Sequence, residues 1–174
     1  MGLFSRTKKP IEYLSPVFVR PATAADAAEI VRLAQSLSMA NGGRPSRLTE
    51  DNYRRDGFGP DPAFAALVAE IDDRNIGYAL YFSGYDTDRA TRGVYLSDLY
   101  VDLAWRRRGV GRALMQETAR ACKDLGGEWM FWSVLKRNKK ARKFYKTMAP
   151  ELSDVVLCAA LGKSFCRLSK QSTS

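Results

Sequence analysis

The spacing of apolar residues along the chain alternates between the two-residue period of strands and the 3.6-residue period of helices. Residues 17–20 predict a first strand, and Thr23 followed by Asp26 forms a capping-box pattern that predicts a helix start. Glycines end this helix at residue 42, and a shorter helix is predicted over residues 48–57. The first helix has its apolar residues at helical spacing: Ile30, Leu33, Ala34 and Leu37.

The middle of the chain predicts a three-strand meander followed by a helix and another strand. Residues 65–71 and 76–82 are apolar runs joined by a polar turn, and residues 93–101 follow a second turn. From Gly111 to about Gly126 the period becomes helical. One face of this helix is predicted to hold Leu114, Thr118, Ala121 and Leu125. A strand over residues 129–134 should then pair in parallel with the strand before the helix.

The remaining segments complete the predicted domain organisation. A basic helix is predicted over residues 138–148, and residues 155–160 and 164–168 predict a hairpin around Gly162. We expect residues 1–15 to be a flexible basic arm, residues 16–170 a single domain, and residues 171–174 a loose tail.

Residues 96–112 carry the clearest functional pattern, because an apolar run leads through a basic turn and two glycines into the helix. Such a turn offers successive backbone N–H groups at a helix N-terminus, where the helix dipole also favours negative charge. Gly109 and Gly111 lack a Cβ atom and let a ligand approach the backbone closely. The pattern therefore predicts a phosphate seat, although the glycine pair alone fits a solvated turn equally well.

Spacing excludes two familiar nucleotide loops. A Walker loop has four residues between its glycines and then Lys and Ser or Thr, whereas one residue separates the glycines here and Arg112 follows. A dinucleotide fingerprint has a third glycine or an alanine where this chain has Leu114.

Composition narrows the chemistry further. The formal net charge of +9 favours an anionic ligand, nucleic acid or an acidic membrane surface. The chain has no histidine, which removes Ser-His, Cys-His and His-metal chemistry. Its cysteines, Cys122, Cys158 and Cys166, lack metal-ligand spacing, so we expect no metal site. No apolar run approaches the roughly 20 residues of a transmembrane helix, and a cytoplasmic location is predicted.

The order of these features resembles the GNAT acetyltransferase superfamily. Arg-x-x-Gly-x-Gly stands between a strand and a helix, and the next strand is followed by Asn138 and then by Phe144 and Tyr145. Within the superfamily the chain is similar to the spermidine/spermine (diamine) and thialysine N-acetyltransferase branch. The similar segments together extend over nearly everything from residue 17 to residue 168: residues 48–50, 56–59, 67–70, 77–82, 85–86 and 95–101.

The resemblance implies an α/β (α+β) GNAT acyl-CoA N-acyltransferase fold, with a mixed, mostly antiparallel central sheet splayed at its middle strands and about four helices. It implies acetyl-CoA as the cofactor, with the pyrophosphate on the turn and the pantetheine on the backbone of the preceding strand. Tyr145 matches the general acid of the family, and a phenol with a pKa near 10 suits that role. The implied cofactor-binding residues are Leu99, Tyr100, Val101, Arg106, Arg107, Arg108, Gly109, Val110, Gly111, Arg112, Asn138 and Tyr145.

At the position where the branch has the residue that accepts a proton from the amine, this chain has a different residue. An alkylamine is mostly protonated at pH 7, and removing its proton costs about 4 kcal/mol. The branch has a glutamate where this chain has Ser97, which could hold a water but is no base. Asp98 is the neighbouring carboxylate, although strand alternation points it to the opposite face and a structural role is an alternative. Glu70 is a weaker candidate, so the predicted catalytic residues are Tyr145, Asp98 and Ser97.

The main functional prediction is an N-acetyltransferase that acts on a primary amine of a small molecule by direct attack in a ternary complex. The alternatives are a catalytically weakened acetyl-CoA-binding or regulatory GNAT domain, for which Ser97 is the argument, and a protein or peptide N-acetyltransferase. The loop of residues 36–48, hereafter the lip, contains Arg44 and Arg47 and no acid, whereas a polycation should be met by carboxylates. Which amine is used therefore stays open. We expect a homodimer, no nucleic-acid partner and no membrane partner.

Overall fold

A computed structural model describes residues 16–170. The predicted flexible arm over residues 1–15 and the loose tail over residues 171–174 lie outside the described residues. The chain divides into two compact units, Met1–Ser133 and Val134–Ser174, which are described in turn. The prediction of a single domain over residues 16–170 stays a prediction.

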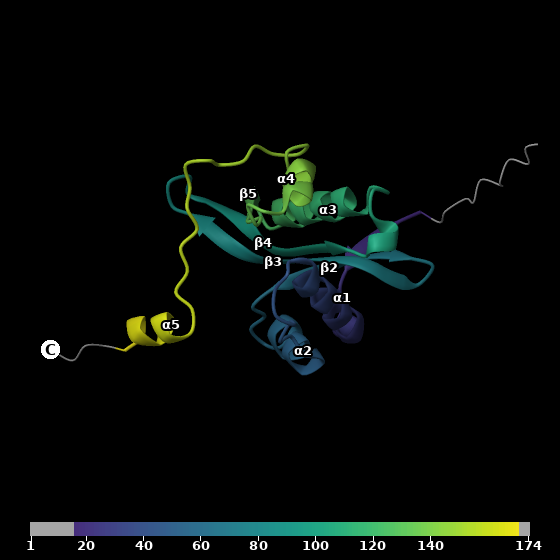
Figure 1. Ribbon diagram of the computed structural model, residues 1–174, viewed down its shortest axis with the longest axis horizontal. Coiled ribbons are helices and arrows are strands. Elements are labelled where there is room, and N and C mark those ends of the chain that lie inside the picture. Colours follow the sequence, from purple (N-terminus) through teal and green to yellow (C-terminus); the bar gives the residue numbers. More distant parts are fainter. Residues whose placement is uncertain (1–15, 171–174) are drawn as a thin grey trace, which may run out of the picture. The chain divides into compact units, whose positions relative to one another are not determined.

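A five-stranded sheet forms the centre of the first unit, and its strands follow one another in chain order (Figure 1). The first four strands pair antiparallel, and the fifth lies parallel to the fourth. The strands are β1 (Phe18–Pro21), β2 (Ala65–Ile71), β3 (Arg74–Asp86), β4 (Thr91–Val101) and β5 (Gly127–Trp132). This mixed, mostly antiparallel sheet confirms the predicted fold class.

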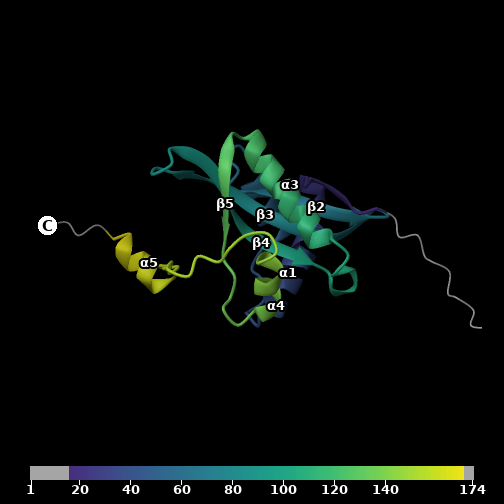
Figure 2. The same cartoon turned by 90° about the horizontal axis from the view of Figure 1, so that it is seen from above.

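Helices cover both faces of the sheet (Figures 1 and 2). One face is covered by α1 (Ala27–Ala40) and α2 (Glu50–Phe58), and the other by α3 (Val110–Asp124). Two short 3-10 turns, η1 (Ala24–Asp26) and η2 (Leu103–Trp105), precede α1 and α3. The predicted capping pair forms the entry to α1, because the backbone N–H and the hydroxyl of Thr23 both donate to the Asp26 carboxylate.

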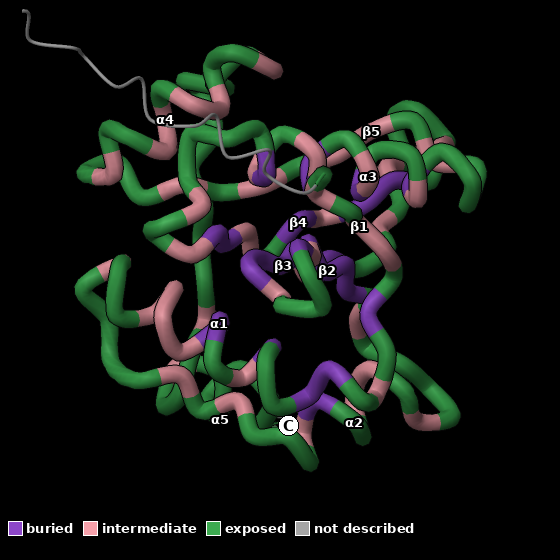
Figure 3. The backbone as a smooth tube through the Cα atoms, turned by 90° about the vertical axis from the view of Figure 1, so that its right-hand side faces the viewer, coloured by how far each residue is buried: buried purple, intermediate pink, exposed green. Residues whose placement is uncertain are grey.

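The core lies on both sides of the sheet, where the buried residues concentrate (Figure 3). Tyr53 of α2 and Tyr78 of β3 are fully buried in the layer beneath α1 and α2. The buried residues of α3 are Val110, Leu114, Met115, Thr118 and Cys122. The predicted apolar face is therefore wrong at Leu125, which follows the last helical residue and is 57% exposed.

The second unit contains α4 (Lys139–Tyr145) and α5 (Lys163–Leu168). The prediction of a hairpin over residues 155–160 and 164–168 is wrong, because the first segment has no regular structure and the second is helical. A strand needs a partner for its backbone groups, whereas a helix satisfies them locally, as in the bond from the Cys166 N–H to the Gly162 carbonyl. Within residues 16–170, no helix has the length and apolarity needed to cross a membrane.

Candidate active site

Strand β4 separates from its neighbour β5 partway along its length. The paired register runs from Arg92 with Gly127 to Leu96 with Trp132, and β4 then continues to Val101 without β5. Within the part of the chain that the structure describes, residues 97–101 of β4 thus have a strand partner on the β3 side alone. This is the predicted splay, and it leaves one edge of the β4 backbone available to a ligand.

Ser97 is the extra residue of a β-bulge at the start of this splay. Leu80 of β3 pairs with Asp98, and the next residue, Tyr81, pairs with Leu96, so Ser97 has no cross-strand partner. A bulge interrupts the alternation of side chains along a strand and is common beside active sites. The expectation that strand alternation separates Ser97 from Asp98 assumed an uninterrupted strand, so at the bulge it stays a prediction.

Asp98 has a specific side-chain partner beneath α1 and α2. The Tyr78 hydroxyl donates a hydrogen bond of 2.8 Å to Oδ2 of Asp98. Burial raises the pKa of the Asp98 carboxyl above its ordinary value, and the bond from Tyr78 partly offsets this rise. Burial and the neighbouring Asp98 together raise the pKa of Tyr78, so its phenol stays protonated as the donor. Asp98 is thus a half-buried carboxylate with raised basicity at the bulge.

Glu70, the weaker candidate base, has a different role. Its carboxylate accepts bonds of 3.0 Å and 2.9 Å from Nε and Nη2 of Arg20. The same guanidinium binds Asp26 with two bonds of 2.9 Å and holds the pKa of that carboxyl well below its usual range. Glu70 therefore belongs to an ion-pair network that ties β1 to β2 and η1.

The turn that follows β4 has unusual backbone geometry. Arg107 has φ +63° and Gly109 has φ +84°, and α3 begins directly afterwards at Val110, one residue before the predicted start. Left-handed residues within a turn direct neighbouring backbone N–H groups into a concave nest that suits an anion. A left-handed conformation costs a residue other than glycine of order 1 kcal/mol, and such strain concentrates at functional sites.

Two of the three arginines of the turn contact neighbouring groups of the protein itself. Nε of Arg106 donates a 2.8 Å bond to the Val101 carbonyl, and its guanidinium lies 5.2 Å from the centre of the Tyr100 ring. The Arg108 guanidinium lies 5.0 Å from the centre of the Trp105 ring. These contacts hold the turn against the end of β4. They support the prediction that the seat is formed by backbone, with arginine charge as reinforcement.

Two further observations bear on whether this turn could hold a pyrophosphate. A Cβ atom added at Gly109 would meet nothing within 4 Å, so the glycine leaves open space where a ligand can approach. The side chains of Tyr100 and Val101 are buried, so the splayed end of β4 offers a ligand mainly its backbone. Leu99 is half-buried on the same stretch.

Asn138 and Tyr145 stand at the two ends of α4 in the second unit. Oδ1 of Asn138 accepts a 3.1 Å bond from the Ala141 N–H and so caps the helix. Burial raises the pKa of Tyr145 to about 12, and its ring centre lies 5.2 Å from that of Phe144. Tyr145 is therefore a protonated hydrogen-bond donor throughout the neutral pH range.

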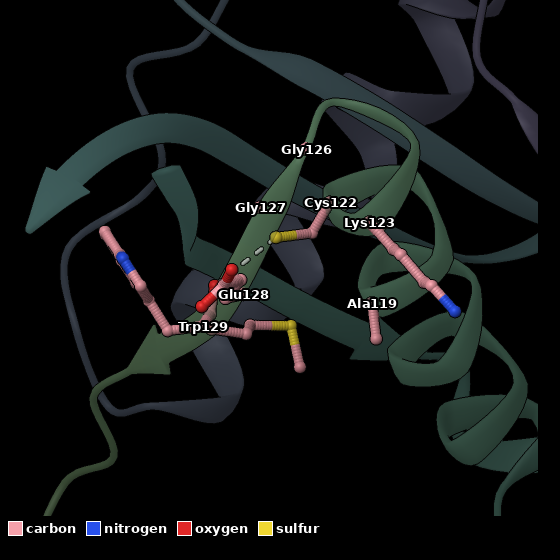
Figure 4. Close-up of a pocket in the computed structure, with 8 residues that line it drawn as sticks. Ala119, Cys122, Lys123, Gly126, Gly127, Glu128 and Trp129 are labelled. Atoms are coloured by element: carbon pink, nitrogen blue, oxygen red, sulfur yellow. Dashed lines mark hydrogen bonds between the residues drawn. The ribbon is translucent and has the colours of Figure 1, made fainter. Parts of the chain in front are cut away.

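Sequence reasoning missed Tyr78 as the partner of Asp98. The two residues are 20 positions apart and meet through the pairing of β3 with β4, so no local signal identifies them. An open hollow of about 590 Å³ lies elsewhere, between the end of α3 and β5, where the Cys122 thiol donates to the Trp129 carbonyl (Figure 4). None of the predicted site residues lines it.

The sequence matches the acetyltransferase (GNAT) family model over residues 30–149. It is 33% identical to the thialysine N-epsilon-acetyltransferase of Sus scrofa over 144 residues, covering 78% of this chain and 84% of that protein. It is 29% identical to the human spermidine/spermine N(1)-acetyltransferase-like protein 1 over 135 residues, covering 73% of this chain and 19% of that protein. The fold is similar to an integron cassette protein from the mobile metagenome of V. cholerae, with a TM-score of 0.75, 19% identity, and coverage of 89% and 98% of the two chains.

Proposed function

Since the chain belongs to the GNAT family of acetyltransferases, we propose that it transfers acetyl from acetyl-CoA to a primary amine of a small molecule, by direct attack in a ternary complex. One observation supports this most strongly. The left-handed backbone at Arg107 and Gly109 leads directly into the N-terminus of α3, beside a strand edge that β5 has left. The names of the relatives given above, which refer to thialysine and to spermidine and spermine, agree with a small amine as acceptor.

At the cofactor end, the backbone from Arg106 to Arg112 would hold the pyrophosphate of acetyl-CoA, which supplies an acetyl group activated as a thioester. The N–H groups of the turn and of the first turn of α3 would donate to phosphate oxygens. The free edge of β4 at Leu99 and Val101 would bind the amide groups of the pantetheine arm, and we assign Asn138 to the same arm.

At the acceptor end, Asp98 and Ser97 would prepare the amine for attack. The raised pKa of the Asp98 carboxyl brings its basicity closer to that of the amine and so lowers the cost of proton transfer. Ser97 is exposed at the bulge, where its hydroxyl could hold a water between the amine and Asp98. The Tyr78 bond would orient the carboxylate.

Tyr145 would stabilise the departing thiolate by donating a hydrogen bond. Because its pKa is about 12, full proton transfer to a thiolate whose conjugate acid has a pKa of about 8.5 runs uphill. The proton released by the amine would therefore complete the thiol, through water or through Tyr145 as a relay.

The second candidate function is an acetyl-CoA-binding domain with weak catalysis. It is favoured by Ser97, which stands where the resembled branch has a glutamate. The cytoplasmic location, the homodimer and the protein or peptide acceptor remain predictions from the sequence.

Release of free CoA, followed with a thiol reagent in the presence of a panel of amines, tests the proposal. The panel should include diamines, aminoalkyl-cysteines, amino acids and a lysine peptide, and mass spectrometry should confirm the acetylated product. We expect amine-dependent release with at least one small amine. Saturable acetyl-CoA binding without transfer to any amine would instead support the binding domain.

A further inference from the structure

Two stacked aromatic rings lie on the face of the sheet that also carries the Asp98 carboxylate. Phe82 of β3 and Tyr95 of β4 are cross-strand partners, and their ring centres lie 5.3 Å apart at an interplanar angle of 26°. Tyr78 and Leu80 precede Phe82 at two-residue spacing, and both belong to the layer beneath α1 and α2. Phe82 therefore continues the face on which Tyr78 binds Asp98.

Trp129 of β5 extends this aromatic surface, and two glycines make room for its ring. A Cβ atom at Gly84 would lie 2.7 Å from Cη2 of Trp129, and one at Gly93 would overlap the indole ring. Nε1 of Trp129 donates a 3.3 Å bond to the Thr91 carbonyl, and the ring lies on the side of β5 away from α3 (Figure 4). The indole is thus held directly against the backbone of β3 and β4.

Phe131 completes a surface of four neighbouring rings. Its ring centre lies 5.0 Å from that of Trp129, and its backbone is paired with Tyr95. Phe82 is 42% exposed and Phe131 is 40% exposed, whereas Tyr95 and Trp129 are half-buried. These four residues are hereafter the aromatic floor. Because adjoining apolar groups exposed to water commonly mark a binding surface, the floor indicates a site for an apolar ligand group.

The aromatic floor adjoins the candidate base along β3. Leu80, the cross-strand partner of Asp98, is followed on the same face by Phe82. Neighbours on one face of a strand lie about 7 Å apart. A short alkyl chain would therefore connect an amine at the Asp98 carboxylate to a ring that lies on Phe82.

The aromatic floor also reaches the point where β4 and β5 separate. Tyr95 pairs with Phe131, the next pair is Leu96 with Trp132, and the printed register of the described chain ends there. Ser97, which is exposed at the bulge, follows directly. A molecule on the floor would thus direct one end toward the splayed part of β4, to which we assign the pantetheine arm.

The floor offers aromatic rings and no charged side chain. The nearest carboxylate along β3 is that of Asp86, and it is already paired with Arg89. Aromatic rings bind another planar ring by burial of apolar surface and by stacking. A second ammonium of the acceptor would find no carboxylate on the floor, although a cation can also lie over a ring. Diamines therefore belong in the test.

From these contacts we infer that the acceptor carries its primary amine on a short alkyl chain attached to an aromatic ring, and that the aromatic floor binds this ring while the amine reaches Asp98. The inference rests on the proposed function and names a substrate class for it, the arylalkylamines. This class differs from the amines to which the names of the relatives refer.

Three amines separate the ring from the charge. Phenethylamine is compared with putrescine, which has a second ammonium instead of a ring, and with cyclohexylethylamine, whose ring has a similar size but is not planar. The parameter measured is kcat/KM with saturating acetyl-CoA. We expect phenethylamine to be preferred about tenfold or more over putrescine and about threefold over cyclohexylethylamine.

Substitutions in the floor should remove this preference. Phe82→Ala and Phe131→Ala should each raise KM for phenethylamine about tenfold, with little change for putrescine. Phe82→Leu keeps an apolar side chain and should abolish the preference over cyclohexylethylamine. The matched control is Phe18→Ala, because Phe18 is 62% exposed on β1, the edge strand opposite β5. An unchanged KM for acetyl-CoA shows that each variant is folded.

Equal use of phenethylamine and putrescine, or a preference that survives Phe82→Ala and Phe131→Ala, would overturn the inference. A change of oligomeric state in these variants without a change in preference would also overturn it, and would assign the floor to an interface between two copies of the chain. Each of these results includes acetyl transfer and leaves the proposed function intact. Absence of transfer to every amine would overturn the proposed function itself.

Discussion

The two ends of the splayed part of β4 present different kinds of chemical groups. Beyond Val101 the turn offers backbone N–H groups shaped by left-handed residues, while Arg106 and Arg108 contact Tyr100, Val101 and Trp105. At Ser97 the strand bulges, and the available groups are side chains, with Asp98 bound by Tyr78 of the neighbouring strand. The comparison indicates that the cofactor end depends on conformation, whereas the acceptor end depends on which side chains long-range pairing brings together.

Substitution of Gly109 should give the largest effect, a loss of affinity for acetyl-CoA. Gly109→Asp places a carboxylate in the open space of the nest, and we expect the Kd for acetyl-CoA to rise about 100-fold, or about 3 kcal/mol. Gly126→Asp is the matched control, because Gly126 has φ +73° and equally open space at the far end of α3. A similar loss of affinity in both variants would show that the effect comes from backbone strain rather than from the seat.

Removal of the Tyr145 hydroxyl separates chemistry from binding. Tyr145→Phe should lower kcat about 30-fold through loss of the bond to the departing thiolate, with the Kd for acetyl-CoA changed by less than about threefold. Tyr85→Phe, at a tyrosine that is 63% exposed, serves as control. Unchanged turnover in Tyr145→Phe would remove Tyr145 from the catalytic step.

The proposed role of Asp98 as a base should be visible in the pH dependence of kcat/KM. Because the Asp98 carboxyl must be ionised to act as a base, kcat/KM should rise as the pH increases through its raised pKa. Asp98→Asn should lower kcat/KM about tenfold at pH 7 and abolish this acidic limb. Tyr78→Phe removes a bond that lowers the pKa of Asp98, so it should move the limb to higher pH. Superimposable profiles for all three proteins would contradict a base role for Asp98.

The smallest effect is expected at Arg107, and it sharpens the distinction between backbone and charge. Glycine adopts a φ of +63° without strain, so Arg107→Gly should preserve the nest while removing one cation. We expect the Kd for acetyl-CoA to change less than about threefold at physiological ionic strength. A loss comparable to that of Gly109→Asp would show that the arginine side chain holds the ligand.

The sequence located the turn after β4 and the start of α3 better than it located the contacts of Asp98, because the first are local features and the second are not. Gly109 and the change to helical period at residues 110–111 are local features, and local features determine a turn. The bond between Tyr78 and Asp98 depends on the register of two strands, and the bulge at Ser97 shifts that register. Periodicity has no means of locating such a shift.

The wrong prediction of a hairpin over residues 155–160 and 164–168 has a related origin. The apolar run over residues 155–160 has strand propensity, but a strand also requires a neighbour, and its predicted partner, residues 164–168, is helical. The helix over Lys163–Leu168 begins after Gly162 at φ +53°, a turn residue that fits a hairpin and a helix start equally well. Propensity therefore could not decide between the two structures.

A calorimetric titration of the unmodified protein with acetyl-CoA tests the central claim most directly. We predict saturable binding of one acetyl-CoA per chain, weakened about 100-fold in Gly109→Asp and retained in Gly126→Asp. The absence of saturable binding at acetyl-CoA concentrations up to about 1 mM would contradict the assignment of the turn after β4 as the acetyl-CoA seat. A Kd of about 1 mM corresponds to a binding free energy of only about 4 kcal/mol.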